Sequence, residues 1–390
     1  MSTVTVDPIA TSANESGLCN AVPGWPSTFD HTLPHVIGVL PGEGIGPEVI
    51  DITLEVLEVL AAHGSRRFDI RVGGPIGVPA QQQYGQSLTD DVITFCSDTF
   101  SAGGAILCGP GGGRFVYDLR TQFDLYCKLT PLRPFRAMQD TGALRPERTE
   151  GIDIVAVREN IGGLYFGSWG SEVQPNGRLL AYQHFSYLEE EVDRILDVSL
   201  RLALRRRQRL AVVTKPGGVP AISTLWENRL HHLNKEKNVK TWILEVDNAV
   251  YQLIANAHEF DVIVSPNMFG DVLADCGALL LGSRGMSFSG NFGQAGRAVY
   301  QTGHGAARDL AGTDRANPIG QILSLAMMLR ESFCWQEGAQ VIEEAIEETL
   351  AKGYRTPDIS SPGCQLVGTR ELGRRICDTL QDVVSAADLS

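Results

Sequence analysis

The sequence lacks the features that mark several large classes of protein. No apolar run reaches the roughly 20 residues needed to cross a membrane. Basic residues are too few for a nucleic-acid or anionic-membrane surface, because 33 Lys and Arg face 46 Asp and Glu and leave a net charge of −13. An anionic small molecule remains possible as a ligand, since it needs only a local basic pocket.

Cysteine pairs at metal-binding or redox spacing are also missing. The eight cysteines are scattered without a CxxC pair, at positions 19, 96, 108, 127, 276, 334, 364 and 377. We therefore expect reduced thiols and a cytoplasmic protein. Residues 1–35 lack the basic start and apolar centre of a signal peptide. They are expected to form a flexible extension that carries no chemistry.

From residue 35 onward, the sequence alternates short β-branched segments with longer helical ones. Strands are expected within 35–42, 66–74, 102–110, 151–160, 209–216, 239–248 and 260–267, and helices within 46–64, 88–100 and 317–332. This alternation is typical of an α/β protein with a mostly parallel sheet. A chain of 390 residues is long enough for two domains.

The segment FGDVLAD (269–275) places two aspartates at the start of a helix that follows an apolar strand. Asp271 and Asp275 are four residues apart, so their side chains share one helical face within about 6 Å of each other. Two interpretations remain open. The acids complement the positive end of the helix dipole, or they bind a divalent cation such as Mg²⁺ or Mn²⁺.

Two glycine-containing segments are candidates for ligand-binding loops. LPGEGIGPEV (40–49) lies between a strand and a helix, but its glycines alternate and do not form the GxGxxG dinucleotide motif, so a plain tight turn is an alternative. TGHGAARDLAGTDRANP (302–318) combines small residues with His304, Asp309 and Asn317. Small residues allow backbone N–H groups to approach a ligand, and Asp309 is suited to accept hydrogen bonds from a ribose.

Basic residues gather in two further segments. Arg158 ends an expected strand in IVAVRENIGGLYFG (154–167), where Tyr165 follows two glycines, and 116–135 contains Arg120, Lys128 and Arg133. Arginine at the carboxyl end of a strand in an α/β protein often faces a ligand. Each of these charges alone is compatible with a solvated surface. Together they favour a pocket for a polyanion.

The motifs GEGIGPE, VRENIGGLYFG, NMFGDVLAD, HGAARDLAG and ANPIGQILSLAMML, in this order, resemble the isocitrate/isopropylmalate dehydrogenase family of metal-dependent β-decarboxylating dehydrogenases. The resemblance extends from about residue 36 to 382. It implies oxidation of a 3-substituted malate by NAD(P)⁺ with Mg²⁺ or Mn²⁺, followed by loss of CO₂. It also implies a two-domain α/β fold around a central cleft that is not a Rossmann fold. The large cofactor-binding domain would comprise 36–126 and 283–390, and the small domain 127–282 would carry a homodimer interface.

The resemblance also implies roles for individual residues. Asp271 and Asp275 would bind the metal together with Asp247 of the partner subunit. Lys215, also from the partner, would relay the hydroxyl proton as a base with a lowered pKa, and Tyr165 would protonate the enol carbon. Arg120 and Arg158 would hold the departing carboxylate. The NAD⁺ site would involve His304, Gly305, Ala306, Ala307, Asp309, Leu310 and Asn317, and the Asp309–Leu310 pair favours NAD⁺ over NADP⁺.

Several positions depart from the family pattern: Glu43 replaces an aspartate, Thr130 an arginine, Gly217 an asparagine, Gln301 an acid and Arg308 a proline. Lys128 or Arg133 would compensate for the missing arginine. In GGGRFVYD (111–118), the resemblance places Arg114 where isocitrate enzymes have a serine that contacts the extra carboxylate. An arginine there favours an acidic substituent as in isocitrate, homoisocitrate or phosphonomethylmalate. Exposure of Arg114 to solvent is the alternative. Isopropylmalate, tartrate or malate as substrate, and a non-catalytic regulatory subunit, are the competing functions.

Overall fold

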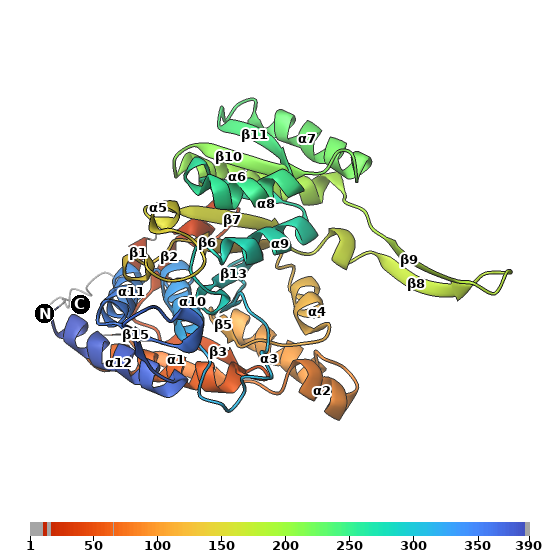
Figure 1. The fold of residues 1–390 in the computed structure, drawn as a ribbon. Coiled ribbons are helices and arrows are strands. Elements are labelled where there is room, and N and C mark those ends of the chain that lie inside the picture. The colour runs from red at the N-terminus through yellow and green to blue at the C-terminus, as the bar shows by residue number, and fades with distance from the viewer. Residues whose placement is uncertain (1–10, 14–16, 65, 387–390) are drawn as a thin grey trace, which may run out of the picture.

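The computed structural model describes residues 11–13, 17–64 and 66–386. Its centre is a ten-stranded sheet with the order β11-β10-β12-β7-β6-β13-β14-β5-β3-β4 (Figure 1). The strands of this sheet are β3 His35–Leu40, β4 Phe68–Val72, β5 Ala105–Cys108, β6 Cys127–Leu132, β7 Ile154–Glu159, β10 Arg209–Thr214, β11 Lys240–Glu245, β12 Val262–Ser265, β13 Phe288–Phe292 and β14 Ala298–Thr302. Shorter pairs are β1 Thr11–Ala13 with β2 Thr28–Asp30, β8 Ser168–Val173 with β9 Leu179–His184, and β15 Tyr354–Arg355 with β16 Gln365–Leu366.

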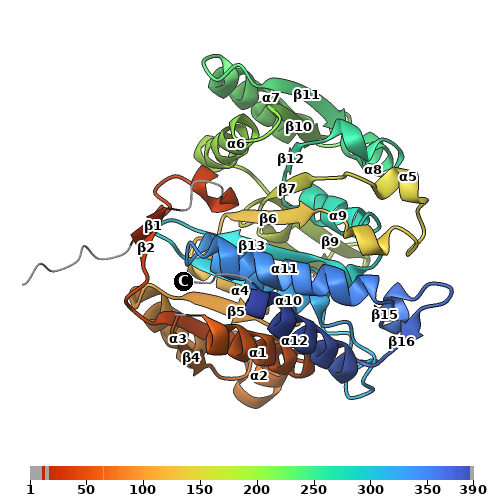
Figure 2. The ribbon, with the colours of Figure 1, turned by 90° about the vertical axis from the view of Figure 1, so that its left-hand side faces the viewer.

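Helices flank this sheet. They are α1 Gly46–His63, α2 Gly77–Tyr84, α3 Asp90–Ser101, α4 Phe115–Gln122, α5 Pro146–Thr149, α6 Glu189–Leu204, α7 Pro220–Asn234, α8 Val246–Ala255, α9 Asn267–Gly277, α10 Ile319–Glu331, α11 Gln336–Ala351 and α12 Thr369–Ala386. Helices α1, α10, α11 and α12 pack on one another (Figure 2), and α10 also packs on β13 and β14. Because it is enclosed in this way, α10 is buried along nearly its whole length. None of the described helices is both long and apolar enough to cross a bilayer.

The expected strands and helices are present, but the sheet is mixed rather than mostly parallel in its centre. Three neighbouring pairs are antiparallel: β7 with β6, β6 with β13, and β13 with β14. The strands on either side of this group pair in parallel. The β13–β14 hairpin has only a short connection, from Gly293 to Arg297, and such a connection can join only antiparallel strands. The sequence pattern does not predict this hairpin, because Gly290 interrupts β13 and each of the two strands is only 5 residues long.

The expected domain boundary falls between β6 and β13, which are hydrogen-bonded neighbours. The strands assigned to 127–282 therefore form one half of the sheet, and those assigned to 36–126 and 283–390 form the other half. The sheet is continuous across this boundary. The division of the chain into two folding units remains a prediction.

The expectation of a flexible extension is wrong for residues 17–35, whereas residues 1–10 and 14–16 lie outside the described part. Cys19 and Trp25 are buried against α10. The Cys19 backbone N–H donates to the Glu331 carboxylate at 2.9 Å, and the Trp25 indole N–H donates to the Glu331 carbonyl at 3.1 Å. Apolar burial and these hydrogen bonds together fix the segment to the body of the protein.

His35, the first residue of β3, makes stability depend on pH. It is fully buried among aromatic rings, stacking on Phe29 at a centroid distance of 4.7 Å, and burial lowers the pKa of its imidazole to about 4. An unfolded histidine titrates near 6.5, so folding favours the neutral ring. This contribution is complete above pH 6.5 and is lost as the pH falls towards 4.

We therefore expect the wild type to lose about 2 kcal/mol of unfolding free energy between pH 7 and pH 5, relative to a His35→Phe variant that keeps the ring stacking. Urea denaturation of both proteins at each pH measures the difference. Parallel pH curves for the two proteins would contradict the assignment to His35.

Candidate active site

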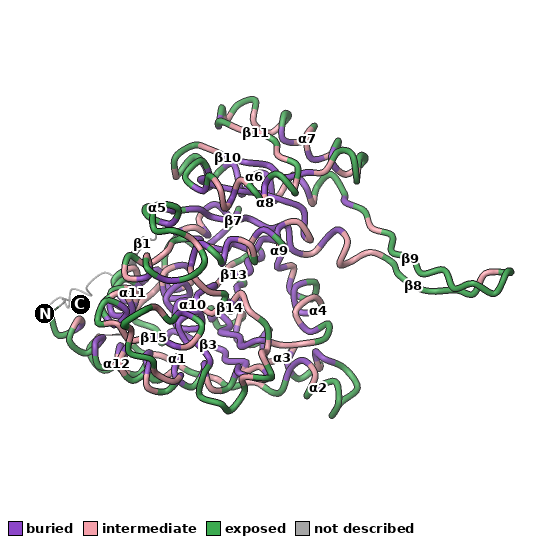
Figure 3. The backbone as a smooth tube through the Cα atoms, in the orientation of Figure 1, coloured by how far each residue is buried: buried purple, intermediate pink, exposed green. Residues whose placement is uncertain are grey.

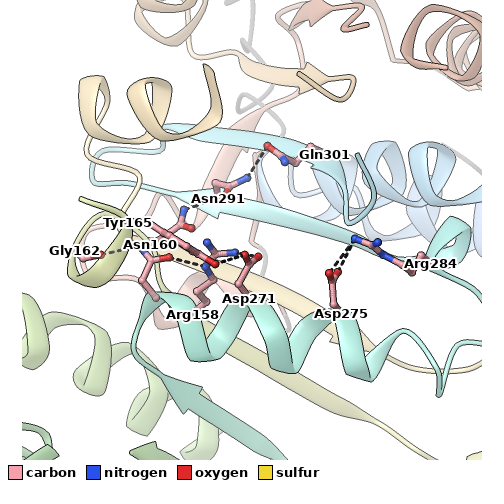
Figure 4. A network of polar contacts seen from close by, with 10 residues as sticks. Arg158, Asn160, Gly162, Tyr165, Asp271, Asp275, Arg284, Asn291 and Gln301 are labelled. Carbon is pink, nitrogen blue, oxygen red and sulfur yellow. Dashed lines mark hydrogen bonds and ion pairs between the residues drawn. The ribbon is translucent and has the colours of Figure 1, made fainter. Parts of the chain in front are cut away.

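Asp271 is the centre of a polar network on α9 (Figure 4). Its two carboxylate oxygens accept from different groups: one from the Arg158 guanidinium, and the other from the Tyr165 hydroxyl at 3.0 Å. Arg158 comes from the end of β7, and Tyr165 from the short helix η3 Gly163–Tyr165 that follows. Three segments of chain thus meet at one carboxylate.

Close packing of α9 on β7 makes this meeting possible. A Cβ atom added to Gly270 would lie 2.8 Å from the Cβ of Arg158, which only glycine avoids. Asn267, at the start of α9, accepts from Arg158 Nε at 2.9 Å and donates to the Gly162 carbonyl at 2.9 Å. Asn267 was not selected from the sequence, although it lies one turn before Asp271 on the same helical face.

The charges in the network tune one another. Burial alone would raise the pKa of the Asp271 carboxyl, but Arg158 and Lys128, with the Tyr165 hydroxyl, hold it below its ordinary value. Burial and the neighbouring Asp271 carboxylate raise the pKa of Tyr165 to about 12. At neutral pH the carboxylate is therefore ionised and the phenol keeps its proton.

Asp275, one turn further along α9, has a different partner from Asp271. It pairs with Arg284 at 2.9 Å, and both side chains are about half exposed. No group of three or more His, Cys, Asp or Glu side chains suited to a metal occurs within 11–13, 17–64 and 66–386. A single chain thus brings two of the three expected metal ligands onto one helix, and Asp247 lies elsewhere.

Asp247 and Lys215 form a second polar group. The Lys215 ammonium donates to Glu245 at 2.6 Å and to Asp247, which lies in the first turn of α8. Hydrogen bonds to these two carboxylates raise the pKa of Lys215. The expected lowering is therefore wrong for the isolated chain, because the lysine faces carboxylates and not cations.

Three basic side chains converge beside Asp271. Arg120 on α4, Lys128 on β6 and Arg158 on β7 are each at least nine-tenths buried. Burial and the nearby Arg158 lower the pKa of Arg120 to about 9. Arg133 does not join them: it is exposed and follows the opposite end of β6, about 16 Å along the strand from Lys128. Its expected place in the pocket is wrong for this reason.

Arg114 is held by its own neighbours. Its guanidinium lies 4.8 Å from the Trp169 ring centroid and 5.1 Å from that of Tyr117, and its Nε is 3.6 Å from the Asp118 carboxylate. Tyr117, which was not selected from the sequence, also contacts the Tyr165 ring edge-on at 5.4 Å. Tyr117 lies three residues before Arg120 on α4, a spacing that puts both on one helical face.

The loop after β14 carries the residues expected to bind NAD⁺. It packs against the glycine loop that precedes α1, since the Ala306 carbonyl accepts from the Ile45 N–H at 2.9 Å. A Cβ atom at Gly44, where φ is +62°, would lie 1.9 Å from that carbonyl oxygen. Arg308 pairs with the buried Glu43 at 2.7 Å. Glu43 and Arg308, which both depart from the family pattern, therefore form an ion pair with each other.

The other loop residues differ in whether their polar groups have hydrogen-bond partners. Asn317 donates to Asp358 at 3.1 Å and accepts from the Ile319 N–H at 3.0 Å, so its side chain is held in the turn that leads into α10. His304 Nδ1 contacts the Gly305 carbonyl at 2.9 Å, and its buried Nε2 has no partner. Leu310 and Ala307 pack on a small apolar cluster, and Asp309 is exposed.

Comparison with known proteins gives this geometry a context. The family model described as isocitrate/isopropylmalate dehydrogenase matches residues 36–376. A 3-isopropylmalate dehydrogenase of Gloeobacter violaceus is 38% identical over 355 residues, which cover 87% of this chain and 96% of that protein. The 3-isopropylmalate dehydrogenase of Aquifex aeolicus is 36% identical over 365 residues, covering 90% and 98%.

Solved structures are similar as well. The crystal structure of isocitrate dehydrogenase from Methylococcus capsulatus superposes with a TM-score of 0.79 at 27% identity, covering 89% of this chain and 99% of that one. The crystal structure of the TT0538 protein from Thermus thermophilus has a TM-score of 0.77 at 28% identity, with coverage of 88% and 68%. The fold is therefore the expected α/β fold and not a Rossmann arrangement.

The expectation of an acidic substituent is contradicted by these relatives, which are named 3-isopropylmalate dehydrogenases. The structure supplies a physical reason for the error. Arg114 is engaged by Asp118 and two aromatic rings, and the side chain of α4 that faces Tyr165 is the Tyr117 ring. With the motifs, the fold and the sequence relatives in agreement, this chain is a dehydrogenase that belongs to the isocitrate/isopropylmalate dehydrogenase family.

Proposed function

We propose that the protein oxidises and decarboxylates 3-isopropylmalate with NAD⁺ and a divalent metal ion. The observation that carries this proposal is the arrangement around Asp271. Buried cations for carboxylates, an acidic metal ligand and a protonated phenol lie side by side, and the Tyr117 ring borders them. The names of the relatives support a branched alkyl substituent, for which an aromatic ring is a suitable neighbour.

Substrate carboxylates would bind to Arg120 and Arg158. Both guanidiniums are buried, where a charge-assisted hydrogen bond is strong, and Arg120 has no ion-pair partner among the described residues. Arg158 is oriented by Asn267 and Asp271, so its planar donors have a defined direction. These contacts would orient the hydroxyl carbon towards the cofactor loop and the leaving carboxylate towards Arg120.

Tyr165 would supply the final proton. Lys215 of the partner subunit would take the hydroxyl proton while the hydride passes to NAD⁺, which leaves a ketone. Cleavage of the bond to the neighbouring carboxylate would then release CO₂ and an enolate, and return of the proton from Lys215 to the enolate oxygen would give an enol. The enol carbon then needs a proton. A phenol with a pKa of about 12 is protonated at neutral pH, and its hydrogen bond to Asp271 fixes its direction.

The donor set suits a hard divalent cation. Asp271 and Asp275 offer carboxylate oxygens from one face of α9, with Asp247 of the partner subunit as the third ligand. Such a metal supplies Lewis-acid stabilisation of negative charge on the substrate oxygen. The Arg158 and Arg284 contacts of the two aspartates would rearrange or be shared when it binds.

A homodimer would complete the site. The β8–β9 arm projects from the body and is exposed along almost all of its length (Figure 3). Trp169, Val173 and Leu179 on this arm are 53%, 72% and 69% exposed. An isolated two-stranded ribbon with apolar residues in water is marginally stable, so we expect a second copy of the chain to bury these residues.

The direct test is NADH formation, followed by absorbance, with 3-isopropylmalate and Mn²⁺, alongside malate, tartrate and isocitrate. The highest kcat/KM is expected for 3-isopropylmalate. A higher value for isocitrate or tartrate would overturn the proposed substrate, and no turnover of any of the four would overturn the proposed reaction.

NAD⁺ should be preferred to NADP⁺. The exposed Asp309 carboxylate can accept from ribose hydroxyls and would repel a 2′-phosphate of about −2 charge. Arg308, the nearest cation in sequence, is already paired with Glu43. We expect kcat/KM to favour NAD⁺ by at least about 10-fold, and Asp309→Lys with Leu310→Tyr to shift the preference towards NADP⁺. Steady-state kinetics with both cofactors tests this, and a preference of the wild type for NADP⁺ would contradict it.

A further inference from the structure

Lys128 lies on the same face of the sheet as the substrate-binding arginine of β7. In the antiparallel β6–β7 pair it is directly opposite Arg158, and in the β6–β13 pair it is opposite Asn291. Directly opposed residues point to the same face, with Cβ atoms about 5 Å apart. Register therefore places the lysine ammonium beside the Arg158 guanidinium.

The Lys128 ammonium makes no direct contact with an acceptor in the described part of the chain. The side chain is only 7% exposed, and neither a hydrogen bond nor an ion pair joins it to any residue in the described part of the chain. Arg120 is in the same situation, with a buried Nε that lacks an acceptor. Buried, unpaired cations are costly unless an anion neutralises them.

The nearby carboxylates are already used. Asp271 accepts from Arg158 and Tyr165, and Asp275 pairs with Arg284. Two buried cations therefore remain, and they are matched in charge by an external dicarboxylate. Thr130, two residues along β6 on the same face, is buried and neutral, so it offers a hydroxyl where the family pattern has an arginine.

We propose that Lys128 is a substrate-binding residue that holds a carboxylate of the malate core, and that it supplies the cation missing at position 130. This inference rests on the proposed function, since it takes a hydroxydicarboxylate as the ligand. A purely structural role does not explain this lysine, because an unpaired buried charge destabilises the ligand-free protein.

The first measurement compares Lys128→Met with the wild type in steady-state kinetics. Loss of one charged hydrogen bond should raise the KM for 3-isopropylmalate about 10- to 100-fold and leave the KM for NAD⁺ unchanged. The KM for malate should rise by a similar factor, because malate has the same two carboxylates. Lys128→Arg should restore much of the loss. The matched control is Arg133→Met, which removes an exposed cation at the other end of β6 and should change neither KM.

The second measurement does not depend on turnover. Thermal unfolding of the ligand-free Lys128→Met protein should occur at the same temperature as the wild type or higher, and the stabilisation of the wild type by added malate should be largely lost. A variant that malate stabilises as well as it does the wild type would overturn the inference. A loss of affinity for 3-isopropylmalate without one for malate would also overturn it, by placing Lys128 at the substituent. If no substrate is turned over, the proposed reaction fails, and the malate stabilisation still decides the role of Lys128.

Discussion

Replacement of Asp271 by asparagine is expected to reduce kcat by about 10³-fold or more. The amide keeps the size and one acceptor oxygen of the carboxylate but removes its charge. It thereby removes the negative charge of a proposed metal ligand and the counter-charge of Arg158 at the same time. The rate of NADH formation in the presence of Mn²⁺ measures the loss of kcat. The shift of the unfolding temperature on addition of Mn²⁺ measures binding at the metal site directly.

The fold should survive this substitution, because Asp271 is partly exposed and the amide can still accept from Arg158 or Tyr165. Asp118→Asn serves as the control, since that aspartate is similarly exposed and pairs with Arg114 outside the network. Full activity of Asp271→Asn, or wild-type activity that persists in excess EDTA, would remove the proposed metal chemistry.

Mixtures of two inactive variants, Lys215→Ala and Tyr165→Phe, are expected to recover activity when subunits exchange. In one chain, Lys215 is bonded to Glu245 and Asp247, whereas Tyr165 is bonded to Asp271, and no hydrogen bond or ion pair joins the two groups in the described residues. If each site combines Tyr165 of one subunit with Lys215 of the other, a heterodimer contains one intact site and one doubly defective site.

An equal mixture should then reach about a quarter of wild-type activity, because half of the dimers are mixed and half of their sites are intact. The measurement is NADH formation after subunits have exchanged by refolding or slow exchange. Distinguishable tags on the two variants verify the heterodimers. Unmixed variants at the same concentration are the control. No recovery in verified heterodimers would mean that one chain supplies both residues to its own site.

Local sequence determined much of the fold and part of the site. The i, i+4 spacing of Asp271 and Asp275 did place both on one helix, and the position of Arg158 at the end of β7 did bring it to the site. Strand and helix periods are properties of short segments, so they can be identified without the rest of the chain. The motifs similarly carried the family and the reaction class.

Tertiary structure alone decided which charges meet. Lys128 lies beside Arg158 because β6 and β7 pair in one register, and a shift of one residue would turn Lys128 to the opposite face. Arg114 is held by Trp169, and Glu43 by Arg308, through contacts between segments far apart in sequence. Residue types can indicate that basic side chains bind an anion. Which cations remain unpaired depends on packing between distant segments, and that packing buries Lys128 and leaves Arg133 exposed.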